Sequence, residues 1–119
     1  MAKTALDLTY EEKLMYRPAE AIERRRRLLS TQLEERWQKA QQTARDAAEI
    51  LYKEYAATKV VLFGSGADRS RFTLWSDVDL AAWGIPPVRF FAAVAAVTEL
   101  GEIRVDLVDP AYGSDALRR

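Results

Sequence analysis

Apolar residues in the first half of the chain recur every three or four positions, the spacing of one face of an α-helix. The pattern predicts a helix from Ala19 to about Tyr55, and its apolar stripe consists of Leu29, Leu33, Trp37, Ala40, Ala44, Ala47 and Leu51. Ser30 and Thr31 with Glu34 also fit an internal capping box, so a break near Ser30 stays open. Because such a stripe is costly to expose, we expect it to face the sheet, a second copy of the chain or a partner.

Two polar patterns in the same half concern the start of this helix. Thr9 with Glu12 three residues later fits a capping box and predicts a short helix that ends before Pro18. Four consecutive arginines at 24–27 resemble a nucleic-acid patch at first sight. On a helix they spread around the whole circumference, and glutamates flank them on both sides. This favours a solvated or partner-facing helix.

The second half of the chain has the texture of short strands and turns, and it carries all five glycines. The apolar run at 59–63 predicts a buried strand, and the alternation at 77–82 predicts a second strand. Helical spacing at 88–100, closed by Gly101, predicts a helix, and 103–108 reads as a third strand. The order of these elements predicts an α/β fold with a sheet packed against a long helix.

Size and composition narrow the possible chemistry. The 119 residues suit one domain, with a helical N-terminal extension at 1–57 that packs on the core or a partner, and a core at 58–119. The chain has neither Cys nor His, which excludes disulfides, thiolate or imidazole metal sites and Ser-His-Asp catalysis. Zero net charge argues against binding duplex nucleic acid unaided. Charges throughout the first 17 residues and an apolar stretch too short for a bilayer favour a cytoplasmic location.

Gly64 and Ser65 directly follow the first predicted strand. Glycine allows a sharp backbone turn and lets a phosphate approach closely. Free amides at the start of a helical turn would face an anion, and Ser65 adds a hydroxyl donor. Taken alone, a Gly-Ser pair after a strand is usually just a turn.

Acidic residues stand on the second and third predicted strands. Alternation points Asp77 and Asp79 to the same side of their strand, where two like charges would repel without a cation. Hard divalent ions such as Mg²⁺ prefer oxygen ligands of this kind. Asp106 lies within an otherwise apolar strand and would complete a three-carboxylate cluster if the strands are neighbours. Such a cluster can hold two metal ions, although an Asp-x-Asp on an exposed strand is often merely solvated.

These features occur together in one stretch. From Leu62 to Leu80 the chain reads LFGSGADRSRFTLWSDVDL, and a third acid follows at Asp106. The combination resembles the nucleotidyltransferase superfamily that includes DNA polymerase beta, over about Lys59 to Pro110. The nearest likeness is to the minimal nucleotidyltransferases, many of which serve as the antitoxin of a HEPN-type toxin. The resemblance implies the small mixed β-sheet of the polymerase beta-like core.

The resemblance also implies a role for each matching residue. Gly64 and Ser65 would hold the triphosphate, and Asp77 and Asp79 would ligate Mg²⁺, with two ions in all. Asp106 would be the third carboxylate and would assist deprotonation of the acceptor hydroxyl. The reaction would transfer a nucleotide, AMP from ATP, to a hydroxyl. In the antitoxin members the acceptor is a tyrosine of the partner toxin.

The stretch departs from the family pattern between its two halves. Where the family has Arg-Gly, this chain has Asp68 and Arg69. Arg69 or Arg71 is then the candidate for the missing positive charge beside the phosphates. Ser76, which precedes the first acid, matches the family and joins the predicted nucleotide-binding residues.

Other interpretations keep the same core. In one, the chain is a non-catalytic antitoxin that neutralises its partner by contact, through its N-terminal helix, and the nucleotide site is vestigial. In another, the acceptor is an RNA end or a small-molecule hydroxyl. Trp75 and Trp83 flank the Asp-x-Asp strand, where they would pack in the core, contact a lid or stack on a base.

Overall fold

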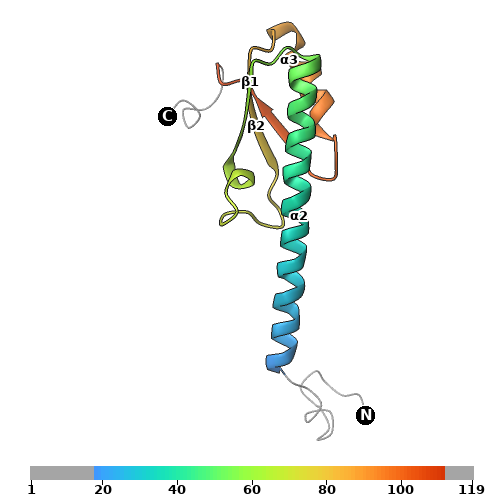
Figure 1. The fold of residues 1–119 in the computed structure, drawn as a ribbon, viewed down its shortest axis with the longest axis vertical. Helices are drawn as coiled ribbons and strands as arrows, with labels where there is room; N and C mark the ends of the chain where they lie inside the picture. Colours follow the sequence, from blue (N-terminus) through green and yellow to red (C-terminus); the bar gives the residue numbers. More distant parts are fainter. Residues whose placement is uncertain (1–17, 112–119) are drawn as a thin grey trace, which may run out of the picture. The chain divides into compact units, whose positions relative to one another are not determined.

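A computed structural model describes residues 18–111. The predicted long helix is present as α2, Pro18–Glu54, and it runs without interruption through Ser30 (Figure 1). Thr31 bonds back within the helix. Its Oγ1 donates to the carbonyl of Arg27 at 3.0 Å, so the hydroxyl is satisfied within the helix and does not cap a new one. The short helix predicted between Thr9 and Pro18 lies outside the described residues.

The chain divides into two units at a point inside α2. The first unit is Met1–Gln32 and the second is Leu33–Arg119. In the described part of the first unit, Glu23 forms exposed ion pairs with Arg26 and Arg27, as expected for a solvated helix. The second unit contains the rest of α2 together with the sheet. The domain boundary predicted at 57/58 stays a prediction.

Three strands form the sheet in the described part of the second unit. They are β1 (Lys59–Phe63), β2 (Val78–Trp83) and β3 (Val105–Val108), and β2 lies in the middle (Figure 1). β1 pairs antiparallel with β2, whereas β2 pairs parallel with β3. A parallel pair needs a crossover connection, which the chain supplies with α3, Pro87–Thr98. The predicted α/β class with a small mixed sheet and a long N-terminal helix is confirmed.

Element boundaries differ from the prediction by one or two residues. The third strand begins at Val105, although Ile103 before it is fully buried and already belongs to the core. α3 ends at Thr98, three residues before Gly101. Gly101 instead allows the backbone to pass close to α2, because a Cβ there would lie 3.1 Å from the Thr43 hydroxyl oxygen.

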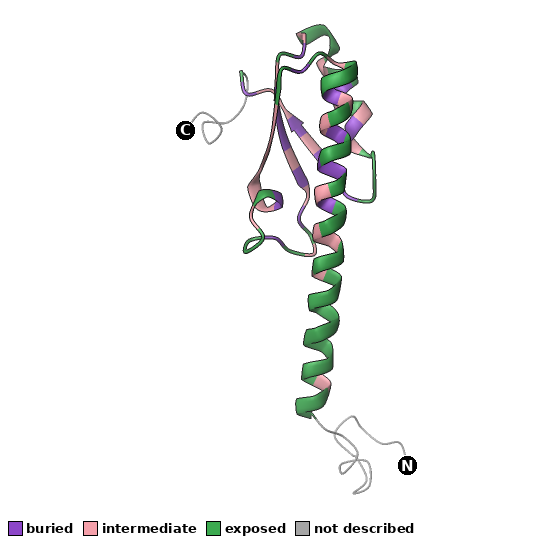
Figure 2. Ribbon diagram, viewed as in Figure 1, coloured by how far each residue is buried: buried purple, intermediate pink, exposed green. Residues whose placement is uncertain are grey.

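Strand alternation separates a core face of the sheet from an open face. The core face carries Val60, Leu62, Val78, Leu80, Ala82, Val105 and Leu107, which cluster with Ala40, Ala44, Ala47 and Leu51 of α2 and Ala93 and Val97 of α3. Small side chains therefore make up most of the buried contribution of α2 to this core. The strand residues between those of the core face, including Asp79 and Asp106, point to the opposite face. Burial follows this division in β3 and in most of β2 (Figure 2). Ala81 of β2 is buried although it lies on the opposite face, and β1 shows no alternation.

The predicted apolar stripe of α2 is only partly buried. Ala40 to Leu51 enter the core, and Leu33 and Trp37 pack partly against it, whereas Leu29 is 46% exposed. Over residues 18–111, no helix has both the length and the apolar composition that crossing a bilayer requires.

Candidate functional site

The turn after β1 brings the Gly-Ser pair against an acidic side chain. Residues Gly64–Ala67 form a single 3₁₀ turn, η1, and Gly64 has a positive φ of 71°. A Cβ at Gly64 would lie 2.7 Å from the Oδ2 atom of Asp79. Glycine is therefore required twice, for the left-handed backbone and for the space that the carboxylate occupies.

Hydroxyl groups join this turn to the residue before the acidic strand. Ser65 Oγ donates to Ser76 Oγ at 2.9 Å, and Ser76 is buried. The backbone N–H of Thr73 donates to the same Ser76 oxygen at 2.8 Å. The structure thus brings together the two predicted serines, 11 positions apart. The sequence analysis did not include Thr73, because a bond from a backbone N–H leaves no signal in the residue type.

The acidic residues gather at one end of the open sheet face. Asp79 and Asp106 are direct partners in the parallel register of β2 and β3, and Asp77 immediately precedes β2. Burial raises the pKa of Asp79 above its ordinary value, and the negative charges of Asp106 and Asp77 raise it further. Among residues 18–111, no donor makes a hydrogen bond to the Asp79 carboxylate. Asp79 is therefore repelled by both neighbouring acids, and a cation beside it would relieve this repulsion.

Asp106 has a basic neighbour that the sequence analysis missed. Arg104 Nε lies 3.1 Å from Asp106 Oδ1, and both side chains are exposed. Residues two apart on a strand share a face, so this pairing could have been read from the sequence. Within the described part of the chain, no three acidic side chains come close enough together to enclose a metal ion. The oxygen donors of Asp77, Asp79 and Asp106 nevertheless suit Mg²⁺ in kind.

The departure from the family pattern after Ala67 forms a self-contained turn. The Asp68 carboxylate accepts from the backbone N–H of Ser70 at 3.0 Å and from its hydroxyl at 2.6 Å. These bonds lower the pKa of Asp68. The Asp68 carboxylate is thus stabilised by hydrogen bonds within its own turn.

Arg69 contacts α2. Its guanidinium pairs with Glu34 at 3.3 Å and lies over the ring of Trp37 at 5.8 Å. The next aromatic along the loop, Phe72, is buried and meets Trp37 edge-on at 5.1 Å. These contacts fix the loop to the helix. The role of Arg69 or Arg71 toward phosphates stays a prediction.

The two tryptophans near the ends of β2 differ in exposure. Trp75 is 83% exposed, and its backbone N–H donates to Thr73 Oγ1. Trp83 is half-buried, and the Lys59 ammonium lies 4.9 Å from its ring centre. Trp75 therefore does not pack in the core of the described protein.

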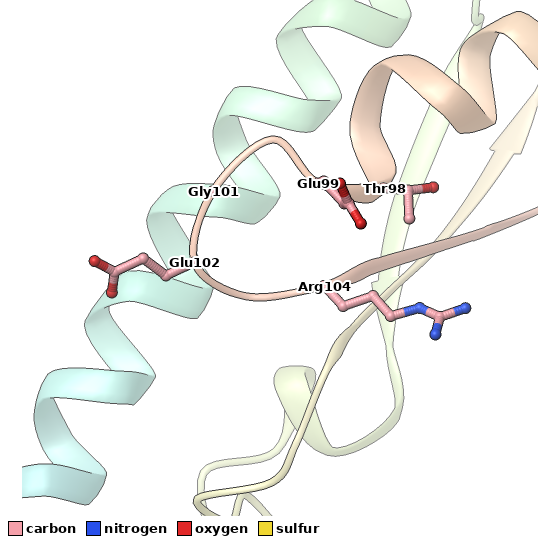
Figure 3. Close-up of a pocket in the computed structure, with 5 residues that line it drawn as sticks. All are labelled: Thr98, Glu99, Gly101, Glu102 and Arg104. Carbon is pink, nitrogen blue, oxygen red and sulfur yellow. The ribbon is translucent and has the colours of Figure 1, made fainter.

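A cavity of about 270 Å³ lies at the connection between α3 and β3, and it adjoins the candidate site through Arg104, which pairs with Asp106 (Figure 3). Its lining residues are Thr98, Glu99, Gly101, Glu102 and Arg104. Glu102 projects on the α2 side of the loop, where it bonds Lys39 at 2.6 Å, and Arg104 projects on the other side (Figure 3). None of the predicted site residues lines this cavity, and its acidic groups differ from those of the candidate site.

Comparison with protein-family models, with curated proteins and with solved structures gave no match to any of the three.

Proposed function

We propose that the protein is a Mg²⁺-dependent nucleotidyltransferase that moves AMP from ATP to a hydroxyl of a partner protein. The observation that supports this most is the position of the Asp79 carboxylate. It lies against Gly64, pairs in register with Asp106 and feels the charge of Asp77. A glycine turn that leaves room for a phosphate thus adjoins a carboxylate that two further acids repel, which suits binding of a metal–nucleotide complex.

Each residue then has a defined task. Asp77 and Asp79 would hold the metal, which neutralises phosphate charge when bound. The turn at Gly64 and the hydroxyl of Ser65 would hold the triphosphate, with Ser76 fixing the Ser65 side chain. Asp106 would take the proton of the acceptor hydroxyl. The hydroxyl oxygen would then bond to the α-phosphorus of ATP, and pyrophosphate would leave.

The partner in this proposal is a HEPN-type toxin, and the acceptor is one of its tyrosines. That assignment comes from the resemblance of residues 62–80 to antitoxin members of the superfamily. The protein would silence the toxin by modifying it.

A second candidate is an antitoxin that acts by contact alone. The ion pair between Arg104 and Asp106 favours it, since a guanidinium already neutralises the third carboxylate. Exposed apolar residues of α2, including Ile22, Leu28 and Leu29, would then form the contact surface.

Calorimetry of ATP binding, with and without Mg²⁺, tests the enzyme proposal. We expect Mg²⁺-dependent binding by the wild type and none by an Asp77→Asn/Asp79→Asn double variant. Asp109→Asn is the matched control, because Asp109 makes a local turn bond to the Ala111 N–H. Folded wild-type protein that binds no ATP, alone or with its toxin, would favour the contact-only antitoxin.

A further inference from the structure

Two polar side chains of α2 reach the backbone of the candidate site. Arg36 Nη2 donates to the carbonyl of Ser76 at 2.8 Å, and Gln41 Nε2 donates to the carbonyl of Gly66 at 2.8 Å. Both bonds are partly buried and join residues 40 and 25 positions apart in the chain. They tie the helix to two separate loop segments.

The two tethered segments are those that build the site. Gly66 follows Ser65 in η1, and Ser76 immediately precedes Asp77. The two segments also lie close together, because a Cβ added at Gly66 would be 3.4 Å from the Asp77 carbonyl oxygen. With the Ser65–Ser76 hydroxyl bond, α2, η1 and the start of β2 form one closed network.

The environment of Arg36 indicates that this side chain does more than fill space in the fold. Its side chain is half-buried, and within residues 18–111 it forms no ion pair with a carboxylate. Its Nε atom is buried without a hydrogen-bond partner in the described protein. A partly buried, unpaired cation lowers stability relative to an apolar side chain of similar length. Retaining one for a single carbonyl bond is reasonable if the position of that carbonyl matters for function.

We propose that Arg36 and Gln41 are positioning residues of the nucleotide site. They do not touch the nucleotide. Arg36 fixes the peptide that aims Asp77, and Gln41 fixes the turn that carries Ser65. This inference rests on the proposed function and adds that α2 is part of the site, so that residues from 58 onward would form an incomplete one.

Affinity measurements on four variants test the proposal. Arg36→Met and Gln41→Met remove the two donors at nearly constant volume. Arg45→Met and Gln42→Met are matched controls, because both residues lie exposed on the same helix and bond only side chains. With all proteins shown to be folded by circular dichroism, we expect the Kd for Mg²⁺-ATP to rise roughly tenfold in the first pair and to stay unchanged in the controls.

Arg36→Lys separates positioning from general support of the fold. A lysine can still donate to one carbonyl, so this variant should recover part of the lost affinity. Amide signals of Ala67 and Asp77, which follow the bonded carbonyls, should shift in ¹H–¹⁵N spectra of the Met variants at 36 and 41 but not in the controls. This spectroscopic arm needs no nucleotide.

The outcomes are distinguishable. Unshifted amide signals would overturn the tether whatever happens to ATP binding. Normal ATP affinity in Arg36→Met and Gln41→Met, alongside binding by the wild type, would overturn the positioning role alone. Absence of Mg²⁺-ATP binding in the wild type would overturn the proposed function, and the positioning role with it.

Discussion

Replacing Gly64 by alanine probes the contact on which the site depends. Alanine in a left-handed conformation, φ 71° here, costs about 1–2 kcal/mol. The added Cβ also meets Asp79 Oδ2 at 2.7 Å, so the carboxylate must rotate away. Because that atom ends a flexible side chain, we assign it less than about 1 kcal/mol. The variant should lose about 2 kcal/mol of unfolding free energy, or roughly 8 °C in Tm.

A double-mutant cycle separates the two contributions. Asp79→Ala removes the contact, so the cost of Gly64→Ala should fall by roughly 0.5–1 kcal/mol in that background, leaving the backbone term. Chemical denaturation of the four proteins measures this coupling. Purely additive losses would refute the contact between Gly64 and Asp79.

Two other glycines provide matched controls. At Gly66 the added Cβ meets only ordinary contacts, 3.4 Å to the Asp77 carbonyl and 3.5 Å to Leu62, so Gly66→Ala should change stability by less than about 0.5 kcal/mol. Gly84 has φ 88° and a Cβ there would lie 2.7 Å from the Thr58 hydroxyl, remote from the acids. The added Cβ would also lie 2.8 Å from Thr58 Cγ2 and 3.0 Å from the Thr58 backbone nitrogen. Gly84→Ala should therefore destabilise at least as much as Gly64→Ala but leave Mg²⁺-ATP binding intact. If Gly64→Ala and Gly84→Ala lost Mg²⁺-ATP binding equally, the nucleotide would not bind specifically beside Gly64.

Three further predictions concern the core, the pH dependence and the third acid. Leu51 is fully buried, so Leu51→Ala should lower the free energy of unfolding by about 2–5 kcal/mol, as measured by urea denaturation. Because the pKa of Asp79 is raised in the folded state, its contribution to stability is present below its unfolded pKa and is lost as pH rises through the folded value. Asp79→Asn should therefore gain stability relative to the wild type as pH rises through that interval, and parallel curves would contradict the assignment. Arg104→Met should change stability by less than about 1 kcal/mol, since the ion pair is exposed, and should raise Mn²⁺ affinity roughly threefold by freeing Asp106; unchanged affinity would mean that Asp106 is not a ligand.

Local sequence patterns predicted most of the helices and strands. Strand alternation correctly separated Asp79 from Leu80, and helical spacing correctly gave one long helix, because each is decided by neighbours in sequence. The possible break at Ser30 was not resolved by pattern, since a Ser-Thr pair can either cap a helix or bond back within it. Thr31 takes the second option.

The assembly of the site depends on long-range pairing. The sequence places Asp79 and Asp106 on strands, but only the parallel register of β2 with β3 makes them partners. The bond from Arg36 to the Ser76 carbonyl spans 40 positions, and no local periodicity signals such a contact. Nor does composition reveal that Trp75 is exposed. Such features arise when elements far apart in the sequence pack together, and local periodicity in the sequence does not reveal these contacts.

Paramagnetic broadening of amide signals by Mn²⁺, a spectroscopic substitute for Mg²⁺, tests the central claim most directly. Titrated in the presence of ATP, the ion should first broaden the signals of Gly64, Asp77, Asp79 and Asp106. The signals of Glu99 and Glu102, which line the cavity between α3 and β3, should stay sharp at the same concentration. Broadening centred on that cavity, or spread evenly over exposed acids, would contradict a metal–nucleotide site at the end of β2.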